Sequence, residues 1–110
     1  MADTNICPKF EKALSILNKR WTGLIVFQLL NGSQRFCNIE SEIGISGRVL
    51  SERLKDLEKE GIVQRKVYDE TPVRIEYSLT EKGTALEPVL NEIQNWSDHW
   101  VEPQEEPVAK

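Results

Sequence analysis

Residues 45–63 read ISGRVLSERLKDLEKEGIV, the pattern of one amphipathic helix with both ends marked. Ser46 stands where an N-cap belongs, because its hydroxyl can accept a hydrogen bond from a free backbone N–H of the first turn. Gly61 is the kind of residue at which helices readily end. Between them, apolar residues at three- and four-residue spacing predict an inward stripe of Val49, Leu50, Leu54 and Leu57.

Three further helices are predicted upstream. The first covers about residues 9–18, with Pro8 in its first turn. The second covers residues 21–30, which are apolar on nearly every side and therefore buried. The third is a short helix from about residue 35 to Gly44, and a tight turn connects it to the helix that begins after Ser46. Two helices joined so closely predict a helix-turn-helix.

The downstream sequence predicts a hairpin and a long final helix. Residues 62–68 and 73–79 are β-branched and aromatic runs separated by a short polar tip. Thr80 is placed to cap a helix that continues to about residue 101. The apolar stripe of this helix consists of Leu86, Val89, Leu90, Ile93, Trp96 and Trp100.

This order of elements predicts an α+β, mainly α fold: a winged helix-turn-helix with a two-stranded wing and an added C-terminal helix. A chain of 110 residues is too short for two domains. We expect one domain with a DNA-binding core at about residues 7–79, a dimerisation helix at about 80–101 and a flexible tail at 102–110. In this fold the second helix of the motif enters the major groove of DNA, and the wing reaches the neighbouring backbone or minor groove.

Composition and motifs argue against several other classes of protein. The longest apolar run is residues 24–27 and the N-terminus has no apolar signal core, so we expect a soluble cytoplasmic protein with no membrane contact. Two cysteines 30 residues apart and one histidine disfavour a zinc site or a disulfide scaffold. Without a phosphate loop, a catalytic triad or metal-ligand spacing, the sequence predicts neither an enzyme nor a bound cofactor.

The formal net charge of −4 is unevenly distributed. Residues 7–83 hold 13 lysines and arginines against 11 acids, whereas residues 84–110 hold one lysine against six acids. This acidic balance argues against indiscriminate coating of nucleic acid, but it is compatible with a local basic face.

From residue 7 to residue 100 the sequence resembles the HxlR-type family of bacterial transcription regulators, winged-helix relatives of the MarR group. The resemblance is carried by Cys7-Pro8, Lys19-Arg20-Trp21, Arg35-Phe36, the stretch 45–63 and TPVRIEYSLTEKG at residues 71–83. It implies a sequence-specific DNA-binding regulator that acts as a repressor. The cysteine before the first helix most resembles that of repressors that respond to quinones, diamide-type oxidants or related electrophiles.

The outward face of the helix after Ser46 carries three basic residues and one acid: Arg48, Glu52, Lys55 and Lys59. Alone, this pattern is typical of a solvated face with ion pairs four residues apart. Its place after the turn favours DNA contact, with Arg48 and Ser51 at base edges and Lys55 at phosphate. Glu52 either accepts from a cytosine amino group or holds a neighbouring arginine. Ser46, at the start of the helix, completes this DNA-binding set.

Three other arginines are candidate DNA contacts. Arg20 and Arg35 open the second and third helices, where free N–H groups and a basic side chain together suit a phosphate. Arg74 lies in the wing just past its proline, where it reaches DNA or pairs with Glu76 or another strand residue. Surface positions without a ligand are the alternative for all three. Trp21 is expected in the core.

Cys7 is the candidate redox-sensing residue. Pro8 places it at the N-terminus of the first helix with Lys9 and Lys12 nearby, and both the helix dipole and the cations favour the reactive thiolate. The alternative is a small apolar residue tucked beneath the helix. Cys37 falls among apolar positions of the third helix and is expected to be buried or half-buried and inert.

The apolar stripe of the final helix exceeds what one small domain covers, so it predicts packing against the same helix of a second subunit. The resulting homodimer would bind a pseudo-palindromic site in double-stranded DNA. The alternative is a monomer whose last helix folds back over its own domain. His99, with no second ligand nearby, is expected at the surface.

Two other functions remain open at this point. A winged-helix domain can serve protein–protein interaction, which the acidic sequence pI of about 5.1 mildly favours. A DNA-binding regulator can also sense a noncovalent ligand in the dimer cleft while Cys7 stays idle, although the sequence shows no dedicated pocket.

Overall fold

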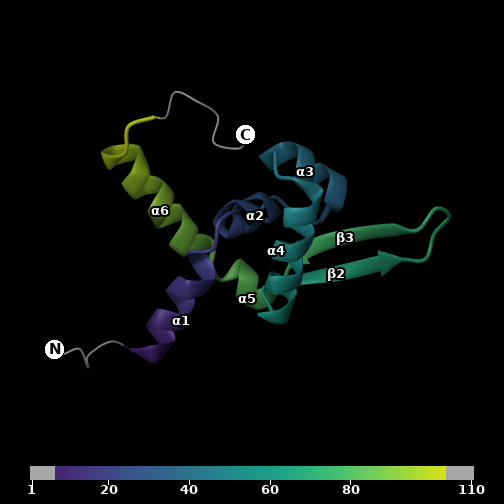
Figure 1. Cartoon of the computed structure of the whole chain (residues 1–110), viewed down its shortest axis with the longest axis horizontal. Helices are drawn as coiled ribbons and strands as arrows, with labels where there is room; N and C mark the ends of the chain where they lie inside the picture. Colours follow the sequence, from purple (N-terminus) through teal and green to yellow (C-terminus); the bar gives the residue numbers. More distant parts are fainter. Residues whose placement is uncertain (1–6, 104–110) are drawn as a thin grey trace.

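The computed structural model describes residues 7–103 as six helices and three strands (Figure 1). The helices are α1 (Pro8–Leu17), α2 (Thr22–Leu29), α3 (Phe36–Ile43), α4 (Gly47–Lys59), α5 (Glu81–Thr84) and α6 (Glu87–Trp100). The strands are β1 (Gln34–Arg35), β2 (Val63–Tyr68) and β3 (Arg74–Leu79). The predicted, mainly helical winged helix-turn-helix is therefore confirmed. The predicted flexible tail falls largely on residues 104–110, which lie outside the described residues.

The core lies where α2, α3, α4 and the sheet meet. α2 contributes Ile25, Val26 and Leu29, and its position at the centre follows from a sequence that is apolar on nearly every side. α4 contributes three of the four residues of its predicted stripe, Leu50, Leu54 and Leu57. The fourth, Val49, is partly buried against this cluster.

The turn between α3 and α4 has the predicted geometry. Gly44 adopts φ +70°, in the left-handed region that favours glycine, and its N–H donates to the Glu40 carbonyl at 3.0 Å. Two residues later the Ser46 hydroxyl accepts the N–H of Val49 at 3.3 Å, which caps α4. These two local devices fix the angle between the helices of the motif.

β2 and β3 form the predicted antiparallel hairpin, with Tyr68 opposite Arg74 near its tip. The two-residue strand β1 adds a third strand that the sequence does not predict, so the sheet order is β1-β3-β2. Two residues are too few to show a strand pattern, and β1 is defined by its tertiary partners. The side-chain amide of Gln34 donates to the Gln28 carbonyl at 2.8 Å and ties β1 to α2.

The single helix predicted from Thr80 is instead two helices. Thr80 caps α5 as expected, because its hydroxyl accepts the N–H of Gly83 at 3.1 Å. α5 then ends at Thr84 and α6 begins at Glu87. Pro88, in the first turn of α6, has no N–H to bond a carbonyl of the preceding turn, so the helix is interrupted there.

Gly83 is buried at the contact between α5 and the start of β2. A Cβ at this position would overlap the Ile62 carbonyl oxygen and come within 3.1 Å of the Leu79 side chain. We expect Gly83→Ala to lower the free energy of unfolding by about 3 kcal/mol, because the overlapped atom is backbone. Urea denaturation followed by circular dichroism measures the loss.

Gly23→Ala is the matched control for that measurement. Apart from its own helix, a Cβ at Gly23 of α2 would have no neighbour within 4 Å. The change is expected to be neutral or to stabilise by up to about 1 kcal/mol, because alanine favours a helix more than glycine does. Equal destabilisation by both substitutions would contradict the importance of the Gly83 contact.

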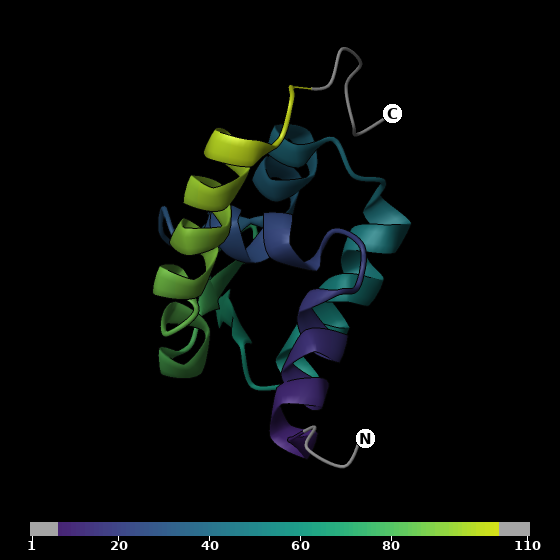
Figure 2. The same ribbon diagram turned by 90° about the vertical axis from the view of Figure 1, so that its left-hand side faces the viewer.

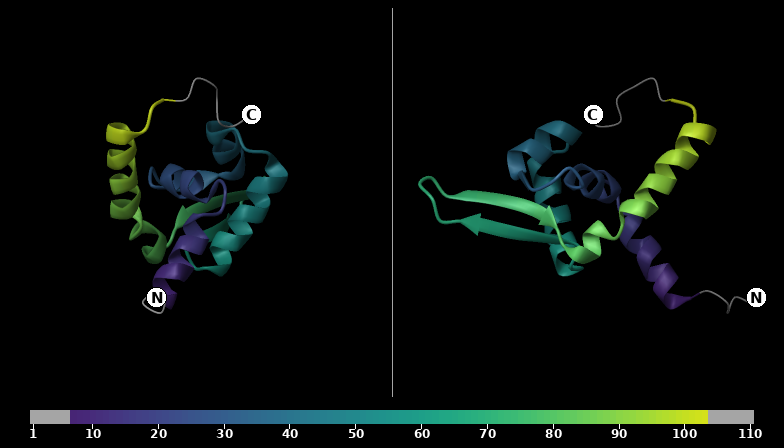
Figure 3. Two further views of the ribbon diagram at one scale, coloured as in Figure 1. Left: turned by 60° about the vertical axis from the view of Figure 1, so that its left-hand side comes forward. Right: turned by 180° about the vertical axis from the view of Figure 1, so that it is seen from behind.

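The molecule has a wing on one side and two helices on the other. α1 and α6 lie away from the β2–β3 hairpin, with α2 and α4 in between (Figures 1 and 3). Figure 2 views the side opposite the wing and shows α2 between α6 and α1. Within residues 7–103, no helix combines the length and apolar character needed to cross a membrane.

Candidate DNA-binding face and thiol sites

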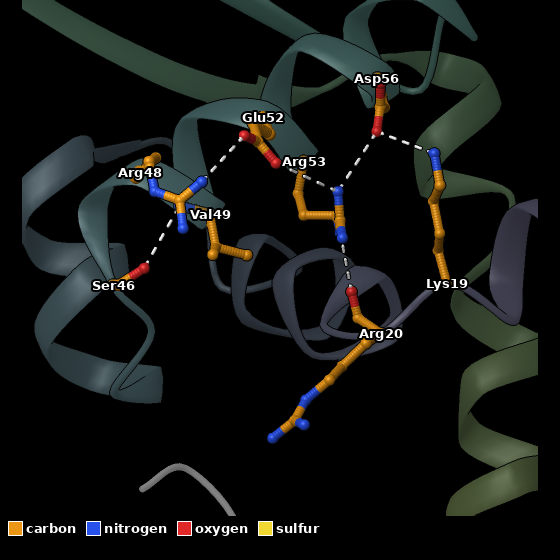
Figure 4. Close-up of polar contacts among 8 residues, drawn as sticks. All are labelled: Lys19, Arg20, Ser46, Arg48, Val49, Glu52, Arg53 and Asp56. Atoms are coloured by element: carbon orange, nitrogen blue, oxygen red, sulfur yellow. Dashed lines mark hydrogen bonds and ion pairs between the residues drawn. The ribbon is translucent and has the colours of Figure 1, made fainter.

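The outward face of α4 holds the sequence-predicted DNA-binding residues in exposed positions. The Arg48 side chain is 82% exposed, and its guanidinium lies 3.7 Å from the Glu52 carboxylate (Figure 4). Lys55 is exposed on the same helix, and Ser51 is half-buried. The Ser46 hydroxyl is occupied by its capping bond to the backbone of α4. The helix therefore presents a flexible cation beside a carboxylate to the solvent.

Arg53 has a more buried place on α4, and the sequence analysis missed it. Its side chain is 21% exposed, and its Nε–H donates to the Arg20 carbonyl at 3.1 Å. One terminal nitrogen lies 3.6 Å from Asp56 and 4.0 Å from Glu52, and Asp56 also accepts from Lys19 at 3.0 Å. Acids one residue before and three residues after an arginine are the signal that could have identified it. This cluster joins α4 to the turn between α1 and α2.

Arg20 and Arg35 lie at the helix starts where the sequence places them. The Arg20 guanidinium lies 5.0 Å from the centre of the Trp21 ring. Trp21 is the N-cap residue of α2 with φ +78°, and it packs against the core while remaining partly exposed. Arg35 is the N-cap residue of α3. Neither helix start has a side-chain cap. The first backbone N–H groups of both helices are therefore not used by a capping side chain, as a phosphate site at these positions requires.

Arg74 is held inside the wing. Its guanidinium donates to Glu70 at 2.8 Å and to Glu76 at 2.6 Å, and it lies 4.0 Å from the centre of the Tyr68 ring. The hydrogen bond to Glu70 raises the pKa of Arg74 above its ordinary value. The hydroxyl of Ser33 donates to Glu76 and lowers the pKa of that carboxyl, and Arg74 lowers it further. This is the paired arrangement that the sequence analysis weighed against a DNA contact.

Arg65 and Lys66 are wing cations that the sequence analysis did not single out. Both are exposed on β2, and neither has a carboxylate within ion-pair distance among residues 7–103. Lys66 lies 6.0 Å from the centre of the Tyr68 ring. The wing therefore has cations that are freer than Arg74.

Cys7 is the N-cap residue of α1, and its thiol is exposed. Its carbonyl accepts the N–H of Glu11 at 3.0 Å, whereas its side chain makes no capping hydrogen bond. Lys12, one of the nearby cations expected from the sequence, pairs with Glu60 of the segment that follows α4 at 3.4 Å. The position is open to a reagent from solution rather than tucked beneath the helix.

Cys37 is also exposed, and the prediction of a buried or half-buried thiol is wrong. α3 buries only Ile39, and Cys37 lies two residues earlier, which places it about 200° around the helix on the far side. Its sulfur lies 4.0 Å from the Asn38 side-chain oxygen. Both cysteines of the chain are thus accessible.

The two thiols belong to opposite parts of the molecule. In Figure 1 the start of α1 lies at the lower left and α3 lies above α4, and Figure 2 also separates the two helices. A disulfide requires Cα atoms within about 7 Å of each other. Cys7 and Cys37 are both free thiols in this conformation, on helices that are not neighbours in these views.

His99 is exposed on α6, and its ring packs edge-on against Trp100 with centroids 4.6 Å apart. In the part of the chain from residue 7 to residue 103, no three histidine, cysteine or acidic side chains gather where a metal ion could bind.

The helices on the side of the molecule away from the wing carry many exposed apolar side chains, called the apolar face below. The exposed apolar side chains of three helices contribute to it: Phe10, Leu14, Leu24, Phe27, Val89, Ile93, Trp96 and Trp100. No residue of α1 is buried, and Leu90 is the buried residue of α6. A groove of about 370 Å³ runs between α2 and α6, bounded by Trp21, Leu24, Phe27 and Ile93 among others. This groove is not predicted from the sequence.

The tight turn, the exposed cationic helix and the strand wing define a DNA-binding protein of the winged helix-turn-helix class. Residues 16–105 match the HxlR-like helix-turn-helix family, so the chain belongs to the HxlR family of transcription regulators. This confirms the family resemblance stated from the sequence.

The chain is similar to proteins named as transcriptional regulators. The HTH-type transcriptional regulator YvaP of Bacillus subtilis is 64% identical over 104 residues, which cover 94% of this chain and 96% of YvaP. The reduced form of the B. subtilis transcriptional regulator YodB superposes with a TM-score of 0.81 at 51% identity, covering 91% of this chain and 99% of that one. Quinone-bound YodB superposes with a TM-score of 0.76 at 48% identity, covering 86% and 100%.

Proposed function

We propose that the protein is a homodimeric repressor that releases its operator when Cys7 is oxidised or alkylated by quinones or other electrophiles. The observation that carries the switch is an exposed thiol at the start of α1, a helix whose Lys12 forms an ion pair with Glu60 at the end of α4. The likeness to quinone-bound YodB supports quinones as the class of signal. The product is an adduct, a mixed disulfide or a disulfide between subunits.

DNA reading is assigned to α4 and the residues around it. Arg48 is exposed at the first turns of α4, where a guanidinium can make the bidentate contact that distinguishes guanine. Lys55 contacts phosphate without reading sequence. The remaining candidates are Arg20 and Arg35 at helix starts, Ser46, Ser51 and Glu52 on α4, and Arg74 in the wing.

A second copy of the chain is the proposed partner on the apolar face. Trp96 and Trp100 are 62% and 67% exposed, and a helix with several large exposed apolar side chains is typical of an interface. A two-fold dimer through this face would place two α4 helices on one side of DNA, about 34 Å apart, at a pseudo-palindromic site.

Arg48→Ala tests the DNA-reading assignment. We expect it to weaken binding to the best duplex by about 1–3 kcal/mol and to relax base preference at one position of each half-site. Lys55→Ala should weaken binding to all sequences alike and flatten the salt dependence. Fluorescence anisotropy with a duplex selected from a random library, and with a scrambled duplex, measures both effects.

The result that would contradict the assignment is an equal loss on the selected and scrambled duplexes for Arg48→Ala. Binding that does not weaken steeply with salt, or failure of the wild type to select any sequence, would favour the protein–protein interaction module instead.

A further inference from the structure

We propose that Arg53 is a positioning residue for sequence reading: it fixes α4 to the turn between α1 and α2 and orients Arg48 through Glu52. This inference rests on the proposed function, in which Arg48 reads bases. The residues that carry it are drawn in Figure 4.

Arg53 and Asp56 attach α4 to the turn between α1 and α2. Arg53 lies near the middle of Gly47–Lys59, and its Nε–H donates to a backbone carbonyl, that of Arg20, at 3.1 Å. One turn further along, Asp56 accepts from Lys19 at 3.0 Å. Two attachments on successive turns of one helix restrict its rotation about its own axis. The direction in which the outward face points is thereby set.

Glu52 lies between Arg53 and Arg48 and connects the two arginines. One carboxylate oxygen of Glu52 lies 4.0 Å from an Arg53 terminal nitrogen, and its other oxygen lies 3.7 Å from an Arg48 terminal nitrogen. Glu52 therefore has one arginine on each oxygen, and the better buried Arg53 holds the carboxylate in place for the exposed Arg48 (Figure 4).

We expect the contacts among Arg53, Glu52 and Arg48 to strengthen DNA binding more than they stabilise the fold. Exposed ion pairs of this kind add little to the stability of a fold. A long side chain that must adopt one rotamer to meet a base pays for that ordering on binding, and a guanidinium already held near the right direction loses less. Of the two roles open to Glu52, this proposal assigns it the role of holding a neighbouring arginine.

Lysine cannot replace arginine in this role. The guanidinium offers Nε–H in one direction and terminal N–H groups in others, so one side chain reaches both the Arg20 carbonyl and the two carboxylates. An ammonium keeps the positive charge but is a single point donor on a flexible stem. Arg53→Lys therefore separates geometry from charge.

The experiment measures selectivity, the ratio of dissociation constants for a scrambled duplex and for the duplex that the reduced wild type selects from a random library. The variants are Arg53→Lys, Glu52→Gln and the same two changes in an Arg48→Ala background. Glu11→Gln is the matched control, because Glu11 is exposed on α1 and has no ion-pair partner among residues 7–103. Urea denaturation establishes that each variant is folded.

We expect Arg53→Lys and Glu52→Gln each to lower selectivity about five- to tenfold, and Glu11→Gln to leave it within about twofold. In the Arg48→Ala background the same two changes should alter selectivity by less than about twofold, because the residue through which they act is gone. A purely structural role predicts equal losses in both backgrounds, and that result would overturn the proposal.

Unchanged selectivity in Arg53→Lys would also overturn it, since charge alone would then suffice. Should Arg53→Lys prove unstable, Glu52→Gln decides the matter, because it leaves the Arg20 attachment intact. A wild type that selects no sequence refutes the proposed function, and this inference with it. A selective wild type with an equally selective Glu52→Gln refutes the inference alone.

Discussion

Replacing Cys7 by serine is expected to abolish the response to quinone or diamide and to leave the affinity of the reduced protein for DNA nearly unchanged. The wild type should lose about 100-fold or more in affinity when modified, because a shifted dimer cannot engage both half-sites together. Serine keeps the size of the side chain but is not a nucleophile under these conditions. Cys7 itself lies at the start of α1, away from the wing (Figure 1), so its replacement should not disturb the recognition of the DNA sequence.

The chemistry at Cys7 differs between the two reagents. When the thiolate sulfur adds to a quinone ring carbon, a C–S bond forms and a ring C=C π bond breaks. Loss of the proton from that carbon and protonation of both ring oxygens then leave a substituted hydroquinone. Diamide takes two electrons and two protons from two thiols and becomes a hydrazine, while an S–S bond forms. Since Cys7 and Cys37 of one chain are both free and lie on helices that are not neighbours, we expect the second thiol to come from another subunit or a small molecule.

Cys37→Ser is the necessary control, because the thiol of Cys37 is exposed as well. This variant should still release DNA on treatment, and mass spectrometry of the wild type should locate the functional modification on Cys7. If Cys7→Ser responds like the wild type while Cys37→Ser is silent, the sensor is Cys37. If both variants respond, the signal is noncovalent, and the groove between α2 and α6 is the place to seek its ligand.

The second large effect is expected from a charge on the apolar face. Ile93→Glu or Trp96→Glu should dissociate the dimer at micromolar concentration, because each places a carboxylate in an interface that offers it no partner. Operator affinity should fall by about 100-fold or more, since a monomer engages one half-site at a time. Light scattering measures the mass, and anisotropy measures the binding.

Asn95→Glu is the matched control for these substitutions. Asn95 is exposed on α6, and it lies about 160° around the helix from Ile93 and outside the apolar stripe. The same charge there should leave both mass and affinity unchanged. A wild type that stays monomeric at micromolar concentration and still binds the full palindromic site tightly would contradict the dimer.

The local chemistry of the chain allowed much of the fold to be predicted. Gly44 and Ser46 act on their immediate neighbours, so the turn and the start of α4 follow from a few residues of sequence. The inward stripe of α4 follows from helical spacing alone. The break before α6 also has a local cause, Pro88, but the apolar stripe that continues on both sides of this proline predicts one continuous helix.

Features that depend on tertiary contacts could not be predicted in the same way. The strand β1 exists because β3 lies beside it. Arg53 gains its role from the carbonyl of Arg20, which is 33 residues away in the chain. Arg74 and Glu76 were recognised as a possible pair, but the added contacts with Glu70 and Tyr68 come from the geometry of the hairpin. The sequence therefore identifies candidate DNA-binding residues, but it does not show which of them are free to contact DNA and which are held by neighbouring side chains.

The positions of the three tryptophans give the protein a built-in spectroscopic signal. Trp96 and Trp100 are exposed on α6, and Trp21 borders the groove beside that helix. The outward face of α4 and the wing carry no tryptophan. Burial of an indole ring shifts its emission to shorter wavelength, so the colour of the intrinsic fluorescence follows the association of subunits. The Arg20 guanidinium, a candidate phosphate contact, lies over the Trp21 ring, so a Trp21→Phe variant leaves Trp96 and Trp100 as a signal that follows the association of subunits separately from the occupancy of DNA.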